Sequence, residues 1–185
     1  MRRLFDLIFA VVLFPLVILL IILCSIAIAV CEGRPIFFRS ERLGKNQQSF
    51  IMIKLRTMSA CAPLIPSSAQ NASVYVTKLG RFLRLTSLDE LPQLFNILNG
   101  SMTFIGPRPC LASEFELVER RGRENIFSLT PGVTGLAQVR GRDTNSMHRK
   151  VRYESFYLNK KSFLFNLRII LITMRAVFKF SDVSH

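Results

Sequence analysis

The chain begins with a long apolar stretch. No charged residue occurs from Leu7 to Cys31, between Asp6 and Glu32. As a helix this run is roughly 37 Å long, which is enough to cross a hydrocarbon core of about 30 Å. The run is too long for the apolar region of a cleaved signal peptide, and no ordinary secreted domain follows it. The pattern therefore predicts a membrane helix.

Two features leave the course of this helix open. Basic residues flank both ends, Arg2 and Arg3 before the run and four more between Arg34 and Lys45, so that both flanks favour the cytoplasmic side. Pro15 interrupts the run, and proline kinks a helix because it removes a backbone hydrogen bond. A re-entrant hairpin satisfies both features. A straight or mildly bent span remains the alternative, since membrane helices tolerate proline.

Shorter patterns follow the apolar run and indicate a mixed fold. They predict a buried strand at Phe50–Ile53, an uncharged loop at Ser59–Val76, helices at Leu91–Leu98 and Glu114–Glu124, and Gly- and Pro-rich shaped loops at Phe104–Pro109 and Pro131–Arg142. The helix at Leu91–Leu98 ends where Asn99-Gly100 stops it. The expected fold class is α+β, mostly helical.

The C-terminal stretch Phe156–Phe180 has the pattern of a single helix. Lys161, Arg168, Arg175 and Lys179 recur on one face, and apolar residues fill the rest. Such a basic stripe suits an amphipathic helix at the membrane interface, where basic side chains reach the headgroups. A core helix with one solvated face is the alternative.

The composition narrows the classes of molecule that the chain is expected to bind. Half of the residues are hydrophobic and the formal net charge is +13, a combination that favours anionic headgroups or a phosphorylated lipid over nucleic acid. A membrane-anchored nucleic-acid-binding protein stays as an alternative, but the arginines lie among Gly and Pro rather than among aromatic residues. With four cysteines in no Cys-x-x-Cys pair and only two histidines, no zinc site can be built, and we expect reduced, structural thiols.

Asp89 and Glu90 are the candidate catalytic residues. Ser87 could cap a helix with Glu90 as its partner three residues on, or the regular helix could start at Leu91 or Pro92. Either way the carboxylates lie at a helix N-terminus, which also favours bound phosphate. An ionised aspartate can attack phosphorus or bind Mg²⁺. Ordinary capping by two acids is the competing interpretation.

Basic residues on rigid segments supply the context for this pair. Arg108 lies between two prolines, Arg140 and Arg142 flank Gly141, and Lys54 and Arg56 follow the predicted strand. Arginine grips phosphate oxygens through two parallel hydrogen bonds. The set suits phosphoryl transfer from a diphosphate, and the chain has no P-loop motif.

Several long motifs, in order, resemble the bacterial sugar transferases, or monotopic phosphoglycosyl transferases. They are Lys54–Met58, Leu79–Arg81, Thr86–Leu94, Phe104–Pro109, and Pro131–Val139 with Gly141-Arg142. The resemblance runs from about Arg3 to Val183 and is closest to small members that consist of the catalytic domain alone.

The resemblance implies a reaction and a topology. Residues 1–33 would form a re-entrant membrane helix broken at Pro15, and residues 34–185 a catalytic domain on the cytoplasmic face of the bacterial inner membrane. Asp89 would attack the β-phosphate of a UDP-sugar, release UMP and pass the phosphosugar to polyprenyl phosphate, with Mg²⁺ bound at Asp89 and Glu90 assisting. The residues expected to bind substrate or phosphate are Lys54, Arg56, Arg108, Gln138 and Arg142.

Some positions depart from the family pattern. Phe14 precedes Pro15 where relatives often have Ser, Ser101 follows Gly100 where Asp is usual, and Glu154 and Asn166 stand where Asp is common. These departures keep an inactive relative that acts as a membrane scaffold as an alternative. The sequence does not determine the sugar, the glycan pathway or whether the chain forms a homo-oligomer.

Overall fold

A computed structural model describes residues 2–62, 72–141 and 146–178. Its helices are α1 (Arg2–Glu32), α2 (Lys78–Leu85), α3 (Gln93–Asn99), α4 (Phe115–Arg123), α5 (Leu136–Val139), α6 (Met147–Lys160) and α7 (Phe163–Phe178). The strands β1 (Phe37–Leu43) and β2 (Ser49–Leu55) form an antiparallel hairpin, while β3 (Thr103–Ile105) and β4 (Gly132–Thr134) pair in parallel. The prediction of a mostly helical α+β fold is confirmed.

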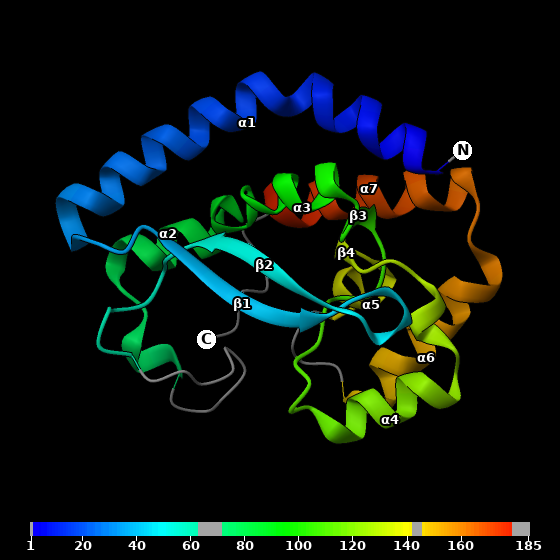
Figure 1. The fold of residues 1–185 in the computed structure, drawn as a ribbon. Helices are drawn as coiled ribbons and strands as arrows, with labels where there is room; N and C mark the ends of the chain where they lie inside the picture. The colour runs from blue at the N-terminus through cyan, green and yellow to red at the C-terminus, as the bar shows by residue number, and fades with distance from the viewer. Residues whose placement is uncertain (1, 63–71, 142–145, 179–185) are drawn as a thin grey trace.

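Helix α1 arches across the domain, over α3 and the β1–β2 hairpin (Figure 1). It is long and apolar enough to cross a membrane. The helix is continuous, with Pro15 inside it, so the predicted break is not seen and the hairpin stays a prediction. The helix does curve along its length in Figure 1.

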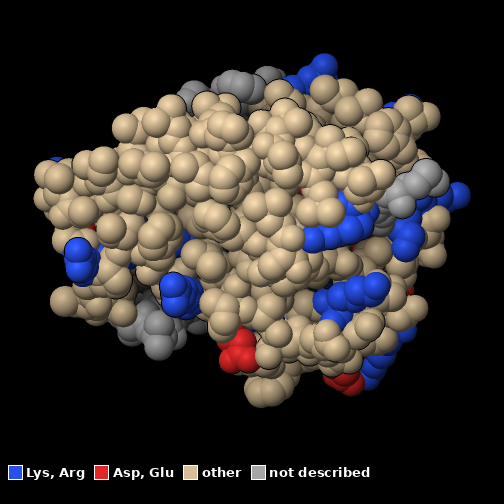
Figure 2. Space-filling model, turned by 45° about the horizontal axis from the view of Figure 1, so that its top comes forward, with Lys and Arg blue, Asp and Glu red and all other residues tan. Residues whose placement is uncertain are grey.

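One face of α1 packs on the domain along almost its whole length. Ala10, Val17 and Ile21 join a core with residues of β2 and α3, and Ile28 packs on Leu55 of β2 and on α2. The opposite face is apolar and exposed, through Leu4, Ile8, Val11, Val12, Leu16, Leu19, Ile22, Leu23, Ile26 and Val30. Figure 2 shows this side as a broad expanse without charged residues, with Lys and Arg below it and at its edges.

Polar contacts tie both ends of α1 to the domain. Near the start, the buried carboxylate of Asp6 accepts a hydrogen bond of 2.7 Å from the Thr103 hydroxyl, and Arg3 donates to the carbonyls of Ile97 and Leu98 at the end of α3. At the other end, Arg56 donates to the backbone carbonyls of Glu32 and Gly33 at 2.8 and 2.9 Å. The contacts of the two arginines pair with carbonyls at helix ends, where intrahelical partners are lacking.

The predicted C-terminal helix is wrong in its extent. The stretch divides at residues 161–162 into α6 and α7, so Lys161 lies in the connection, and Lys179 lies outside the described residues. Arg168 and Arg175 are exposed on α7, beside the exposed apolar side chains Phe163, Leu164, Leu167, Leu171 and Met174. Arg168 and Arg175 therefore lie on one helix, seven residues apart, as predicted, whereas Lys161 does not belong to that helix.

The departures from the family pattern have partners in the fold. Phe14 packs edge-on against Phe95 with 6.2 Å between ring centroids. Ser101 exchanges hydrogen bonds with residues at the end of α3. Asn166 accepts a 2.9 Å hydrogen bond from the Tyr157 hydroxyl. These three residues fill structural positions.

Candidate active site

The acidic pair lies in a 3₁₀ turn, Leu88–Glu90, between α2 and α3. Ser87 opens the turn in the left-handed conformation, with φ of 58°, and its side chain makes no cap hydrogen bond. The predicted capping box is therefore wrong. The regular helix α3 begins at Gln93 after Pro92, close to the other predicted start. A non-glycine residue held at positive φ beside candidate catalytic groups is a strained conformation that the surrounding packing must stabilise.

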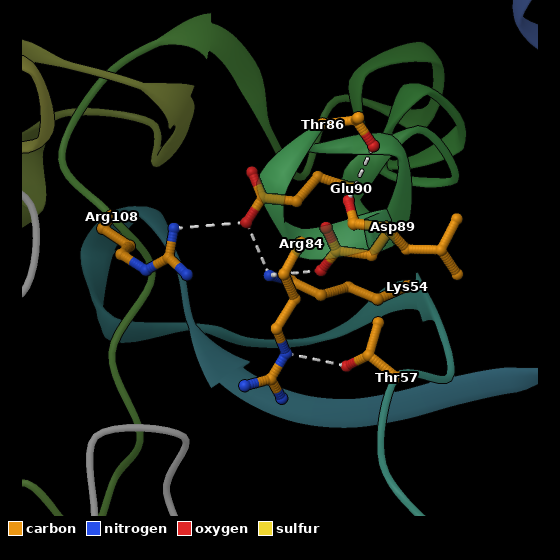
Figure 3. A network of polar contacts seen from close by, with 8 residues as sticks. Lys54, Thr57, Arg84, Thr86, Asp89, Glu90 and Arg108 are labelled. Atoms are coloured by element: carbon orange, nitrogen blue, oxygen red, sulfur yellow. Dashed lines mark hydrogen bonds and ion pairs between the residues drawn. The ribbon is translucent and has the colours of Figure 1, made fainter. Parts of the chain in front are cut away.

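Basic side chains from separate elements converge on the pair (Figure 3). The Lys54 Nζ atom, near the end of β2, is 2.6 Å from Glu90 Oε1 and 4.0 Å from Asp89 Oδ2. Arg108 Nη1, from the loop after β3, lies 3.3 Å from the same Glu90 oxygen. The side chains of Lys54, Asp89 and Glu90 are at most 18% exposed, whereas that of Arg108 is 45% exposed.

The surroundings move the pKa values of the two carboxyls in opposite directions. Burial, together with the neighbouring Glu90 charge, raises the pKa of Asp89 to about 6, against the opposing effect of Lys54, Arg84 and Arg108. Burial also acts to raise the pKa of Glu90, but the charges and hydrogen bonds of Lys54 and Arg108 outweigh it and lower that pKa to about 2. Glu90 is thus a firmly paired anion, and Asp89 is a more basic, less stabilised carboxylate.

Arg84 belongs to the same cluster, and the sequence motifs did not single it out. Its charge acts on Asp89, and its Nε donates a 2.9 Å hydrogen bond to the Thr57 hydroxyl. The approach of α2 to this segment requires Gly80, because a Cβ there would lie 2.0 Å from the Thr57 carbonyl oxygen. Arg84 lies in the last turn of α2. In the sequence, the only indication that it belongs to the site is its position five residues before Asp89.

The other predicted binding residues do not contact the acidic pair in the described part of the chain. Arg56 is buried against the end of α1. The Gln138 amide, on α5, is buried with no hydrogen-bond partner. Arg140 is exposed at the end of α5, and Arg142 lies outside the described residues. The substrate-binding roles of Arg56, Gln138 and Arg142 stay predictions.

The site offers two carboxylates as metal ligands. Among the described residues there is no group of three His, Cys, Asp or Glu side chains that could hold a metal ion. Mg²⁺ is commonly bound through one or two carboxylates, with phosphate oxygens and water completing its coordination. Asp89 with Glu90 therefore fits a magnesium ion that a diphosphate substrate helps to bind, and does not resemble a complete protein-only site.

A profile of the bacterial sugar transferase family matches residues 1–180. The chain belongs to this family. The resemblance carried by the sequence motifs is thus confirmed. The motifs around Lys54, Asp89 and Arg108 meet in the acidic cluster, while the motif around Gly80 packs α2 against the backbone of Thr57.

Relatives of two sizes match the chain. It is 35% identical over 182 residues to the uncharacterized sugar transferase EpsL of Bacillus subtilis, covering 96% of this chain and 87% of that protein. It is 33% identical to the exopolysaccharide production protein ExoY of Sinorhizobium fredii, covering 95% and 84%. It is 36% identical to the UDP-glucose:undecaprenyl-phosphate glucose-1-phosphate transferase of Escherichia coli, covering 89% of this chain but 38% of that longer protein.

Proposed function

We propose that this family member transfers a sugar 1-phosphate from a UDP-sugar to polyprenyl phosphate and releases UMP. The observation that carries the proposal is the buried acidic pair with Lys54, Arg84 and Arg108 around it. The cluster combines a carboxylate nucleophile with cations that can stabilise phosphate oxygens. The longer relatives are named for transfer of glucose 1-phosphate from UDP-glucose to undecaprenyl phosphate, which supports the same reaction class here.

Asp89 is the nucleophile in this proposal. One carboxylate oxygen attacks the β-phosphorus, the bond from that phosphorus to the bridging oxygen breaks, and the electron pair leaves with UMP. An oxygen of the polyprenyl phosphate then attacks the same phosphorus and frees Asp89, which gives a polyprenyl diphosphosugar. The higher pKa of Asp89 supports this assignment, because a more basic carboxylate is the better nucleophile. Glu90, paired with Lys54 and Arg108, positions these two cations.

Magnesium is the proposed cofactor, held by Asp89 and its neighbour Glu90 with the diphosphate of the donor. It would supply positive charge against the phosphate oxygens as negative charge moves to the leaving group. The side chains of Lys54 and Arg108 would contribute further positive charge to the phosphate oxygens. Because the described residues offer only two carboxylates at this site, we expect Mg²⁺ to bind weakly without a diphosphate ligand.

We also propose that both ends of α1 lie on the cytoplasmic side of the inner membrane. The domain contacts α1 from Asp6 to Ile28, a length of about 33 Å. If α1 stood upright through a bilayer, the acidic cluster's own supports, β2 and α3, would have to enter the hydrocarbon region. An α1 that lies along or dips into one leaflet instead buries its exposed apolar face in lipid (Figure 2), as an interfacial helix does. Exposed apolar residues and arginines on α7 fit the same interface.

UMP release tests the proposed reaction. The protein in nanodiscs is incubated with Mg²⁺, polyprenyl phosphate and a panel of UDP-sugars, beside Asp89→Asn and, as a matched exposed-carboxylate control, Glu119→Gln. We expect release with one donor, lost in Asp89→Asn and retained in the control. A protein that forms no covalent adduct at Asp89 and releases no UMP with any donor would instead fit the scaffold alternative.

Cysteine labelling of both ends of α1 in intact cells tests the topology. We expect an impermeant reagent to leave single cysteines introduced at residues 2 and 33 unlabelled until the membrane is opened. Labelling of residue 2 from the periplasm would contradict the proposal, whatever the result of the activity assay.

A further inference from the structure

The loop that carries Arg108 is fixed on the side that precedes the arginine. The Gly106 amide donates to the Thr134 carbonyl and the Gly132 amide donates to the Pro107 carbonyl, each at 2.9 Å. A Cβ on Gly106 would lie 2.4 Å from the Thr130 carbonyl oxygen, so the loop and β4 approach closely. Proline on each side of Arg108 restricts the backbone further. This anchor uses backbone contacts alone.

A second anchor follows Arg108 and combines a backbone hydrogen bond with side-chain packing. The Cys110 carbonyl accepts a 2.9 Å hydrogen bond from the Leu43 amide, and the Cys110 side chain packs with Leu117 of α4 and Val151 of α6. Burial raises the pKa of the Cys110 thiol, but the Arg121 guanidinium is near enough that its positive charge acts to lower that pKa. Arg121, on α4, also binds Glu154 of α6 through two hydrogen bonds of 2.8 and 2.5 Å. The side chains of both ion-pair partners are at most 4% exposed.

Stability alone does not explain why the Arg121–Glu154 ion pair is buried here. Removing two charges from water offsets most of their attraction, so apolar residues of similar size often serve the fold equally well. The pair does fix the orientation of the Arg121 guanidinium, because a planar guanidinium binds a carboxylate in one geometry. Here the guanidinium held in that geometry lies beside a third group, the Cys110 thiol, two residues from Arg108.

We propose that Arg121 is a positioning residue: paired with Glu154, it holds Cys110 and thereby sets the Arg108 guanidinium at its distance from Glu90. The proposal rests on the proposed function for its kinetic consequence, since Arg108 would then bind a phosphate of the donor. The Arg108 side chain is 45% exposed, so its position depends on its backbone more than on packing around its own atoms.

A paired replacement tests the proposal. Arg121→Met with Glu154→Met removes both charges and leaves no unpaired buried ion. The matched control is Arg120→Met with Glu116→Met, a pair on the exposed side of the same α4 helix with 3.0 Å between its charged atoms. We expect the buried replacement to raise the donor KM about tenfold, the effect of losing one charge-assisted hydrogen bond, with kcat changed less than twofold. The exposed replacement should change neither.

The Arg108→Ala background separates positioning from general damage. If Arg121 acts through Arg108, the buried replacement should change the donor KM less than twofold once Arg108 is gone. An equal loss in both backgrounds, or no change in the first, would overturn the proposal. Should the paired variant lose cooperative melting, Glu154→Asp takes its place, because it keeps both charges and shortens the carboxylate by one methylene. The same pattern is expected from it.

A thiol measurement reports on the anchor without any activity. In a chain with Cys24, Cys31 and Cys61 replaced by serine, Cys110 is the one remaining thiol and is 2% exposed. We expect its modification rate to rise at least tenfold in the buried replacement and to stay unchanged in the exposed control. An unchanged rate would overturn the proposal. A raised rate in a protein that never releases UMP would support the anchor while refuting the proposed function.

Discussion

The adjacent carboxylates should respond to neutralisation with opposite changes in stability. The pKa of Asp89 rises from 3.8 to about 6 on folding, so its ionisation opposes folding by about 3 kcal/mol at pH 8. The pKa of Glu90 falls from 4.5 to about 2, so its ionisation favours folding by about 3 kcal/mol. Asp89→Asn should therefore stabilise the protein and Glu90→Gln should destabilise it. Each change corresponds to a shift of roughly 6–12 °C in melting temperature for a chain of this size.

The pH dependence gives the sharper test of the same reasoning. A raised folded pKa gives a cost that is absent below about pH 4 and complete above about pH 6, so the gain from Asp89→Asn should disappear as the pH falls through this window. The benefit of ionised Glu90 is complete above its unfolded pKa of 4.5 and is lost only as the pH falls toward about 2. Melting temperatures in detergent with EDTA, from pH 4 to 8, follow the Asp89 window, across which the loss of stability in Glu90→Gln should stay nearly constant. A lower melting temperature for Asp89→Asn at pH 8 would refute the argument.

Three further predictions follow from the cluster and its supports. Lys54→Met should move the acid limb of the pH–rate profile upward, because the Lys54 charge lowers the pKa of Asp89; an acid limb at an unchanged or lower pH would contradict this. Mg²⁺ added with UDP should raise the melting temperature of the wild type and much less that of Asp89→Asn, whereas equal shifts would place the metal elsewhere. Ser87→Gly should stabilise the fold by roughly 1 kcal/mol, measured by denaturant titration, because glycine adopts φ of 58° without strain; a loss of stability would show that the Ser87 side chain makes a contact of greater value.

A structural role for Asp6 connects the apolar helix to the site's scaffold. Its carboxylate is 7% exposed and accepts hydrogen bonds from the Thr103 hydroxyl and the Phe104 amide at the start of β3. The strand β3 leads directly into the loop that carries Arg108. The apolar helix therefore has a fixed register on the domain and a fixed relation to the loop that carries Arg108.

The sequence predicted the motifs and several helices and strands, because these depend on residues that are close together along the chain. The long apolar run predicted α1, the short apolar run Phe50–Ile53 predicted β2, and Asn99-Gly100 marked the end of α3, where Gly100 adopts φ of 91°. The candidate pair Asp89-Glu90 was also found in this way. Helix extent was less certain, since the break between α6 and α7 has neither glycine nor proline to mark it.

The tertiary structure decided which groups each basic side chain contacts and how the pKa of each carboxyl shifts. Alternation along a strand would place Lys54 and Arg56 on one face, yet β2 ends at Leu55, so Lys54 reaches the acids while Arg56 turns to the end of α1. Asp89 and Glu90 are adjacent carboxylates, yet their pKa values shift in opposite directions. Burial dominates at Asp89, whereas Glu90 also accepts hydrogen bonds from Lys54 and Arg108. Burial and charge depend on groups brought together from distant parts of the chain, and local sequence carries no record of those distances.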